Sequence, residues 1–206
     1  MGVCKVTNHV YTVYVETKEQ IFAAARAAFD RDGLEGLSLR DIARAVGITP
    51  MAIYRHYKDK QALIDALVLD ALGDWSARAQ AVPQDARWLE RMGEAFLDFA
   101  LEQPRRFEAA FLVHSTVARR YPDDFVAGRS PAGVLYLQFF ERAKAQGALI
   151  DDTAPIEIMI TIAGLSQGLI TLYRAGRIAG GEAAFRALFL RAMRRTIESF
   201  LKETPP

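Results

Sequence analysis

Apolar residues recur at helical spacing along almost the whole chain, and this periodicity constrains the fold more than any other feature. The clearest run repeats every three to four residues and comprises Leu63, Ile64, Leu67, Val68, Ala71, Leu72 and Trp75. Such a repeat places one apolar stripe along a single side of a helix. Gly, Pro, Ser and Thr interrupt the pattern at intervals that suit helix ends. The sequence therefore predicts an all-α fold of about nine helices with no sheet.

The chain divides into three segments of different character. We expect an N-terminal arm at residues 1–15, a helix-turn-helix domain at 16–62 and a C-terminal helical bundle for ligand binding and dimerisation at 63–206. The arm contains a strand-like run, His9 to Val15, without a partner strand elsewhere. It is interpreted as a flexible arm, a helix extension or a start-site artefact. Thr17 and Gln20 form a capping box that predicts the start of the first helix.

Composition bounds the environment and the class of protein. The single cysteine, Cys4, excludes an internal disulfide and favours a reducing compartment, so we expect a cytoplasmic protein. We find no signal peptide and no apolar run of about 20 residues, which predicts no membrane span. The net charge of +1 excludes a wholly basic coat, but residues 40–60 carry a local charge of +3. That window favours either a nucleic-acid contact or a solvated helical face.

Two short helices joined by a tight turn are predicted between residues 38 and 57. Ser38 caps the first, and Asp41 occupies its third position, where a carboxylate suits the helix dipole. Gly47 ends this helix in a conformation that glycine tolerates. Thr49 caps the second helix, whose first residue is Pro50. This spacing predicts a helix-turn-helix whose second helix lies in the DNA major groove.

The groove-facing residues combine polar and apolar chemistry. Arg40 is long enough to reach a guanine, and Lys60 in the first turn of the next helix suits a phosphate. Met51 and Ala52 offer apolar contact, for example with a thymine methyl. Tyr57 is interpreted as partly core with its hydroxyl exposed. The full set of predicted DNA contacts is Ser38, Arg40, Thr49, Pro50, Met51, Ala52, Tyr54, Arg55, His56, Tyr57 and Lys60.

The stretch from Ser38 to Leu63 resembles the DNA-binding domain of the tetracycline-repressor (TetR) family. Its Gly, Tyr, Lys and Leu positions fall at the spacing of that family, and the resemblance covers about residues 16–72. It implies a homodimer that binds a palindromic double-stranded operator, usually as a repressor, and releases it when a small effector binds the C-terminal domain. The stretches from Gln103 to Phe107 and from Gly164 to Leu169 resemble a subgroup of this family with a WHG-type C-terminal domain, although Ser166-Gln167 replaces the Trp-His pair.

The C-terminal aromatic residues suit either an ordinary core or a ligand cavity. As a set, large aromatics with a few polar groups favour a small apolar or aromatic effector. The predicted ligand-binding residues are Phe96, Phe99, Phe111, His114, Phe139, Met159 and Gln167.

The last two helices are apolar on several sides, which favours a dimer interface over packing within one chain. Gly164 and Gly168 allow close helix approach, and two helices from each chain would form a four-helix bundle about a two-fold axis. The predicted interface residues are Gly164, Leu165, Gly168, Leu169, Leu172, Leu188, Phe189, Ala192, Met193 and Ile197.

Two rival classes remain, an α-helical enzyme and a small-molecule-binding bundle without DNA activity. The histidines His9, His56 and His114 are widely separated, and the sequence has no metal-ligand spacing, nucleophile elbow or phosphate loop. We therefore expect no enzyme activity, no cofactor and no metal. The local charge of +3 and the paired helix caps argue against a bundle without DNA activity.

Overall fold

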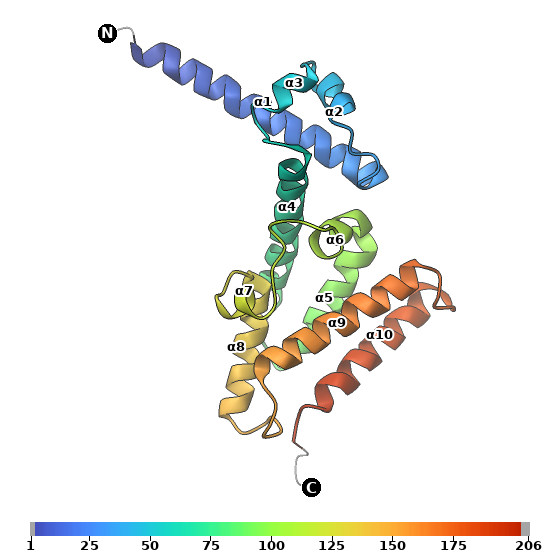
Figure 1. Ribbon diagram of the computed structural model, residues 1–206. Helices are drawn as coiled ribbons and strands as arrows, with labels where there is room; N and C mark the ends of the chain where they lie inside the picture. Colours follow the sequence, from blue (N-terminus) through green and yellow to red (C-terminus); the bar gives the residue numbers. More distant parts are fainter. Residues whose placement is uncertain (1–2, 203–206) are drawn as a thin grey trace. The chain divides into compact units, whose positions relative to one another are not determined.

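A computed structural model describes residues 3–202, with side chains from residue 15 onward. The described residues form ten α-helices and one isolated bridge, between Leu149 and Leu201, so the predicted all-α fold is confirmed (Figure 1). The helices are α1 (Val3–Asp32), α2 (Leu39–Val46), α3 (Pro50–Ile53), α4 (Lys60–Ala81), α5 (Trp88–Glu102), α6 (Pro104–Phe111), α7 (Asp123–Val126), α8 (Pro131–Ala145), α9 (Pro155–Arg174) and α10 (Gly181–Glu198).

Helix α1 begins at Val3, so the predicted start at Thr17 is wrong. The strand-like residues continue the helix, because β-branched and aromatic residues cost only tenths of a kcal/mol each in a helix. The helix-extending interpretation of the N-terminal arm is therefore the one that the backbone adopts. Residues 1–2 of that arm lie outside the described residues.

Two other helix boundaries also differ from expectation. The segment from Tyr121 to Ser130 is rich in Pro, Asp and Gly, which predicts a loose connection, but it contains the short helix α7. Asp152 and Thr153, residue types that cap helices, each predict the start of a long helix, but α9 begins at Pro155. A proline at the first helical position has its φ already set and lacks an N–H that would have no partner in the helix. This preference explains why α9 begins at Pro155.

The helices form two compact units. The first contains the residues up to Leu72 together with 105–118, and the second contains 73–104 together with 119–206. The division falls within α4, so one continuous helix contributes to both units. The sequence placed the domain boundary between residues 62 and 63 and assigned 105–118 to the C-terminal domain. The compact units coincide with neither assignment.

The first unit is built around a core that joins α1, α2, α3 and α4. Its side chains are almost inaccessible, and the apolar stripe predicted along residues 63–75 contributes Leu63, Leu67 and Ala71 to it. The buried members are Ile21, Ala25, Phe29, Leu37, Ile42, Ala43, Ile53, Tyr57, Leu63, Leu67, Ala71 and Ala109. Each large aliphatic or aromatic side chain contributes about 1.5–3 kcal/mol on burial.

Asp65 of α4 holds the segment that follows α6. Its carboxylate accepts hydrogen bonds from the hydroxyl of Ser115 at 2.8 Å, from the N–H of Thr116 at 3.1 Å and from the Thr116 hydroxyl. The side-chain amide of Gln61 donates a further bond at 2.9 Å. Burial raises the pKa of the Asp65 carboxyl, but the bonds from Thr116, Gln61 and Ser115 outweigh it and leave the pKa below its usual value.

Asp70, further along α4, forms a second link. The guanidinium of Arg106, which is 5% exposed, pairs with its carboxylate. Arg26 of α1 approaches the same carboxylate at 3.4 Å. Asp65 and Asp70 together fix residues 105–118 against α4, which explains why this segment belongs to the first unit.

The lowered pKa of Asp65 makes a testable prediction about stability. Because the pKa is lower in the folded than in the unfolded chain, the carboxylate stabilises the fold above its ordinary pKa, about 3.9. That contribution is lost as the pH falls through the folded pKa. We expect Asp65→Asn to lower the free energy of unfolding by about 1–3 kcal/mol near pH 7 and by less near pH 3.5, measured by urea unfolding.

Asp30 provides the control, because it lies on exposed α1 surface and has an ion pair of 3.8 Å with Arg26. Asp30→Asn should change stability by less than about 0.5 kcal/mol. An equal deficit for Asp65→Asn at both pH values would contradict an ionised, hydrogen-bonded carboxylate.

The second unit is a bundle in which α9 packs against α5, α8 and α10. Pairs of aromatic rings pack in the core of this bundle. The ring centroids of Trp75 and Phe96 are 4.9 Å apart, and those of Tyr173 and Phe185 are 4.1 Å apart. Aromatic pairs of this kind add about 0.5–1.5 kcal/mol beyond the area they bury.

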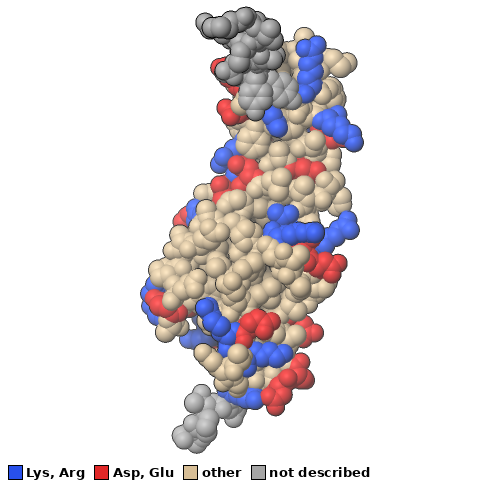
Figure 2. Space-filling model, turned by 90° about the vertical axis from the view of Figure 1, so that its left-hand side faces the viewer, with Lys and Arg blue, Asp and Glu red and all other residues tan. Residues whose placement is uncertain are grey.

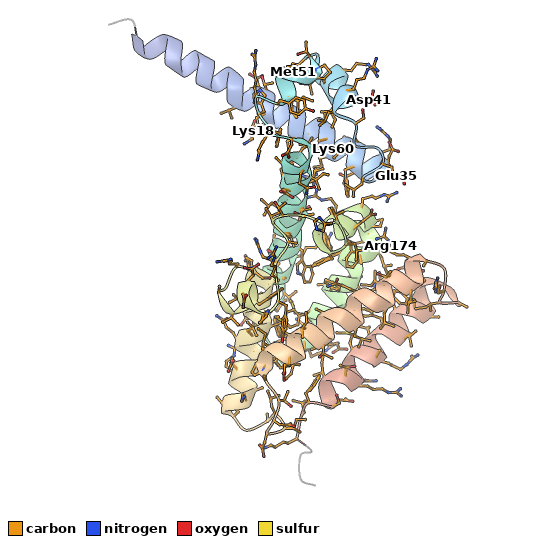
Figure 3. The ribbon with its side chains drawn as sticks, in the orientation of Figure 1. Lys18, Glu35, Asp41, Met51, Lys60 and Arg174 are labelled. Atoms are coloured by element: carbon orange, nitrogen blue, oxygen red, sulfur yellow. The ribbon has the colours of Figure 1, made fainter. Side chains whose placement is uncertain are left out.

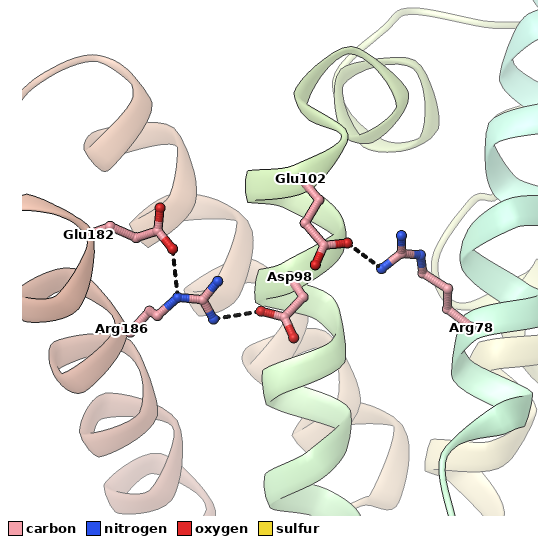
Figure 4. Close-up of polar contacts among 5 residues, drawn as sticks. All are labelled: Arg78, Asp98, Glu102, Glu182 and Arg186. Atoms are coloured by element: carbon pink, nitrogen blue, oxygen red, sulfur yellow. Dashed lines mark hydrogen bonds and ion pairs between the residues drawn. The ribbon is translucent and has the colours of Figure 1, made fainter.

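Ion pairs join α5 to α10 and to the end of α4 (Figure 4). Arg186 of α10 donates to Asp98 of α5 at 2.5 Å and to Glu182 at 2.8 Å. Arg78, in the part of α4 that belongs to the second unit, donates to Glu102 of α5 at 3.1 Å. Partly exposed pairs contribute little free energy each, so we assign them mainly to fixing the helix register.

Helix α9 is long and apolar enough, by length and composition alone, to meet the criterion for a membrane span. This finding corrects the expectation that the chain has no such run. Its buried residues face the bundle of the second unit, and they include Ile158, Ile162 and Ile170. Core helices of soluble proteins pass the same test, so the criterion is weak evidence for a membrane span.

Candidate nucleic-acid interface

Helices α2 and α3 and the turn between them form the predicted helix-turn-helix. The hydroxyl of Ser38 accepts a hydrogen bond from the Asp41 N–H at 3.3 Å, which caps α2. Gly47 ends α2 with φ of +75°, a conformation that side chains with a Cβ rarely adopt. The hydroxyl of Thr49 then accepts from the Ala52 N–H at 3.2 Å and caps α3. Both caps predicted from the sequence are therefore present.

Helix α3 presents an outer surface that mixes polar and apolar groups. Figure 3 shows Met51 on α3. Met51 is 73% exposed and Tyr54 is 49% exposed, whereas Ile53 is buried in the core. Of the predicted contacts from Thr49 onward, the exposed ones are Thr49, Pro50, Met51, Tyr54, Arg55 and Lys60, and the half-buried ones are Ala52 and His56. This pattern leaves one side of α3 available to a partner while the other anchors it.

Tyr57 belongs to the core, as the sequence favoured, since it is only 7% exposed. The ammonium of Lys18 lies 5.7 Å from the centre of its ring. Lys18 is not among the DNA contacts that the sequence predicts. Its position three residues before Ile21 and four before Phe22 is the signal that places it beside this core.

Two cations are well placed to contact a polyanion. Arg40 in the first turn of α2 and Lys60 at the first position of α4 are both exposed, and no ion pair joins either to another described residue. Asp59 caps α4 by accepting from the Ala62 N–H at 2.8 Å. Arg44 differs, because it pairs with Asp41 at 2.8 Å. Arg40 and Lys60 are thus the better candidates.

His56 is half-buried at the end of the recognition segment. Burial lowers the pKa of its imidazole, and the nearby charges of Lys18 and Arg55 lower it further. The side chain is therefore mostly neutral near pH 7 and offers one N–H donor rather than a positive charge.

Basic and acidic residues are mixed over the surface of the protein. On the face in Figure 2, basic and acidic side chains are interspersed and neither kind covers the surface. This distribution agrees with the net charge of +1. Any attraction for nucleic acid must therefore come from local cations such as Arg40 and Lys60.

The predicted ligand-binding residues fall into two groups. Phe96, Phe99 and Met159 are buried in the second unit, where Phe139 and Gln167 are half-buried. Phe111 and His114 belong to the first unit, where Phe111 packs on Phe107 at 5.1 Å and His114 is exposed. Trp88, which was not predicted, stacks on Phe139 at 5.0 Å.

The predicted dimer residues also divide by exposure. Gly164, Gly168, Leu172 and Leu188 are exposed, and Leu165, Leu169, Ala192 and Ile197 are half-buried. Phe189 and Met193 are buried inside the chain, where the hydroxyl of Ser166 lies 3.2 Å from the Met193 sulfur. Those two residues face the core of their own bundle and are unavailable to a partner surface.

No group of three or more His, Cys, Asp and Glu side chains in the described part of the chain could hold a metal ion. The outstanding feature of this part is instead the capped pair of short helices with its exposed outer side. The geometry defines the chain as a helix-turn-helix protein with an additional helical bundle.

Comparison with known families identifies the class. The profile described as "Bacterial regulatory proteins, tetR family" matches residues 21–67, and that described as "Tetracyclin repressor-like, C-terminal domain" matches residues 89–196, more than half of the chain. The chain belongs to the TetR family of bacterial transcriptional regulators, as the resemblance in its sequence implied. The WHG-type subgroup stays a prediction.

Individual relatives are similar at moderate identity. The chain is 26% identical to the class A tetracycline repressor from transposon 1721 of Escherichia coli over 174 residues, 81% of this chain and 72% of that protein. It is 29% identical to the YobS regulator of Bacillus subtilis, of which the match spans 60%. These relatives carry the names of regulators and not of enzymes.

Solved structures show the same fold. A Rhodococcus protein of unknown function superposes with a TM-score of 0.71 at 22% identity, covering 90% of this chain and 96% of that one. A tetracycline repressor variant from Acinetobacter baumannii, solved with minocycline, superposes with a TM-score of 0.59 at 18% identity, covering 87% and 93%. At these identities the likeness concerns the fold.

Proposed function

We propose that this protein is a cytoplasmic, homodimeric repressor that binds a palindromic double-stranded operator and releases it when a small, mostly apolar molecule binds. The exposed outer side of α3, with Arg40 and Lys60 nearby in the sequence, is the observation that carries this proposal. A protein that presents a capped recognition helix and charges suited to phosphate has the parts needed to dock in a major groove. The names of the relatives support the same function.

Arg40 and Lys60 have different roles in this proposal. Lys60 lies at the positive end of the α4 dipole, where a cation and free N–H groups together suit a phosphate. Arg40 carries a guanidinium that can form two hydrogen bonds with guanine. One residue thus contributes affinity for any sequence, and the other contributes a preference.

The first prediction separates these roles by salt dependence and sequence preference. Lys60→Ala should weaken binding to operator and to unrelated DNA alike and reduce the slope of log K against log salt by about 1 for each bound subunit. Arg40→Ala should cost about 1–3 kcal/mol and relax the preference at one base pair in each half-site. Fluorescence anisotropy across salt concentrations measures both.

Arg44→Ala is the matched control, because Arg44 is paired with Asp41 and should affect neither quantity strongly. An equal and uniform loss in the Arg40 and Lys60 variants would contradict the division of roles. Binding without any salt dependence would contradict the proposed function itself.

The exposed side of α9 supports a homodimer. Ile160, Gly164, Gly168 and Leu172 are exposed and recur every four residues, so they lie along one side of that helix. A Cβ added at either glycine would meet nothing within 4 Å, so this side has no neighbour within the described chain. Leu188 of α10 is also exposed. A second copy would cover this apolar side and place two recognition helices on a palindrome.

Leu172→Glu tests the dimer. Leu172 is 43% exposed, so the substitution should leave the chain folded while a charge is introduced into the interface. We expect a monomer by analytical ultracentrifugation and operator affinity at least tenfold weaker. Leu69→Glu is the control, because Leu69 is 44% exposed on α4 and lies outside the proposed interface. A dimeric Leu172 variant would show that the partner binds elsewhere.

The aromatic core of the second unit supports the effector. Trp88 is 3% exposed, and its indole Nε1 has no hydrogen-bond acceptor among the described residues. Tyr136, whose ring lies 5.3 Å from that of Trp88, has a pKa raised by burial. A buried donor without an acceptor costs about 1–3 kcal/mol, which a ligand with an oxygen acceptor would recover. The minocycline complex of the Acinetobacter relative supports a ligand of this general kind.

The effector prediction uses a panel of apolar aromatic compounds, minocycline among them. A compound that raises the melting temperature should lower operator affinity at least fivefold, because binding at two coupled sites is reciprocal. Quenching of Trp75 and Trp88 provides an independent measure of binding. DNA mixed with each compound alone controls for direct DNA binding. Compounds that stabilise the protein without any effect on operator binding would contradict the coupling.

A further inference from the structure

Met51 is an unusual residue to find at the outer side of a recognition helix. Among the large hydrophobic residues that are exposed in the described chain, it has the highest exposed fraction, 73%. Exposed apolar side chains of this size are common singly and need no explanation by themselves. The position of Met51 does need an explanation, because α3 has only four residues and Met51 is the second of them.

Helix α3 lacks the side chains that usually bind base edges by hydrogen bonds. No residue from Pro50 to Ile53 has a side-chain nitrogen or oxygen, and Pro50 also lacks an N–H. Thr49 precedes α3, and its hydroxyl accepts the capping bond from Ala52. The remaining polar side chains of the segment, those of Tyr54, Arg55 and His56, lie beyond the end of α3. Readout by the helix itself must therefore rest mainly on apolar contact.

The major groove presents one apolar group at a base edge in unmodified DNA, the C5 methyl of thymine. We propose that Met51 determines sequence specificity by packing its thioether side chain against a thymine methyl in each half-site. This inference rests on the proposed operator binding and adds to it the base that faces α3. Met51 suits the role because its unbranched, polarisable side chain adapts its shape to a contact.

Deoxyuridine tests this contact, because it lacks the methyl group and keeps every hydrogen-bonding group of thymine. An operator is first selected from a random pool of DNA, and each thymine of a half-site is then replaced singly by deoxyuridine. In the wild-type protein, one position should lose about fourfold in affinity, the value for one buried methyl group. In Met51→Ala, which binds the selected operator more weakly, the same replacement should have less than a 1.5-fold effect.

Two further measurements sharpen the result. Replacing the sensitive T·A pair by C·G should weaken wild-type binding, and 5-methylcytosine at that position should recover part of the loss. Met51→Gln keeps the length of the side chain and places an amide in the groove, so it should lose the distinction between thymine and deoxyuridine. Leu69→Ala is the control: it removes an exposed apolar side chain from α4 and should bind as wild type does.

The outcomes distinguish this inference from the function on which it rests. A wild-type protein that selects no sequence from the pool would overturn both. Selection of an operator with no thymine sensitive to deoxyuridine, or with the same sensitivity in wild type and Met51→Ala, would overturn the Met51 contact alone. Because Met51 is mostly exposed, its substitution should leave the melting temperature within about 2 °C, which separates loss of contact from loss of folding.

Discussion

The burial of Ile53 and Tyr57 in the core that they share with residues of α1, α2 and α4 is the packing interaction on which the recognition surface depends. Helix α3 has four residues and α2 has eight, both far shorter than the roughly 12 residues that an isolated helix needs in water. Their caps supply about 1 kcal/mol each, which is too little to hold them alone. The core therefore fixes the orientation of α3, and the outer residues are free to be chosen for binding.

The same dependence extends to residues 105–118. This segment lies far from the helix-turn-helix in sequence, yet Asp65 and Asp70 of α4 hold it within the first unit. Arg106 is almost completely buried, so its charge requires a partner such as Asp70. Long-range polar links of this kind join a segment of the C-terminal sequence to the DNA-binding unit, and α4 itself continues into the second unit. Any signal from a ligand to the DNA-binding unit has these covalent and polar connections available.

The sequence predicted the features that depend on local chemistry. The caps at Ser38 and Thr49 and the left-handed turn at Gly47 all follow from short-range rules, and all are present. Two kinds of feature could not be obtained in this way. The start of α1 depends on a balance between weak helix propensities before Thr17 and the cap signal at Thr17. The helix continues through Thr17 despite that signal. The grouping of residues 105–118 depends on ion pairs between residues 36 apart, which no local pattern reveals.

Exposure, rather than residue type, separates the predicted site residues that a partner can reach from those that it cannot. Tyr57, Phe189 and Met193 have the chemistry of binding residues but are buried in their own units, whereas Met51, Arg40 and Lys60 are accessible. Of these three, Lys60 suits the uniform phosphate backbone, Arg40 suits guanine, and Met51 suits a group that only thymine provides. Our proposals thus assign docking on the backbone and sequence preference to different side chains. Because the charged contacts weaken with salt and an apolar contact does not, discrimination between operators should persist at salt concentrations where overall affinity has fallen.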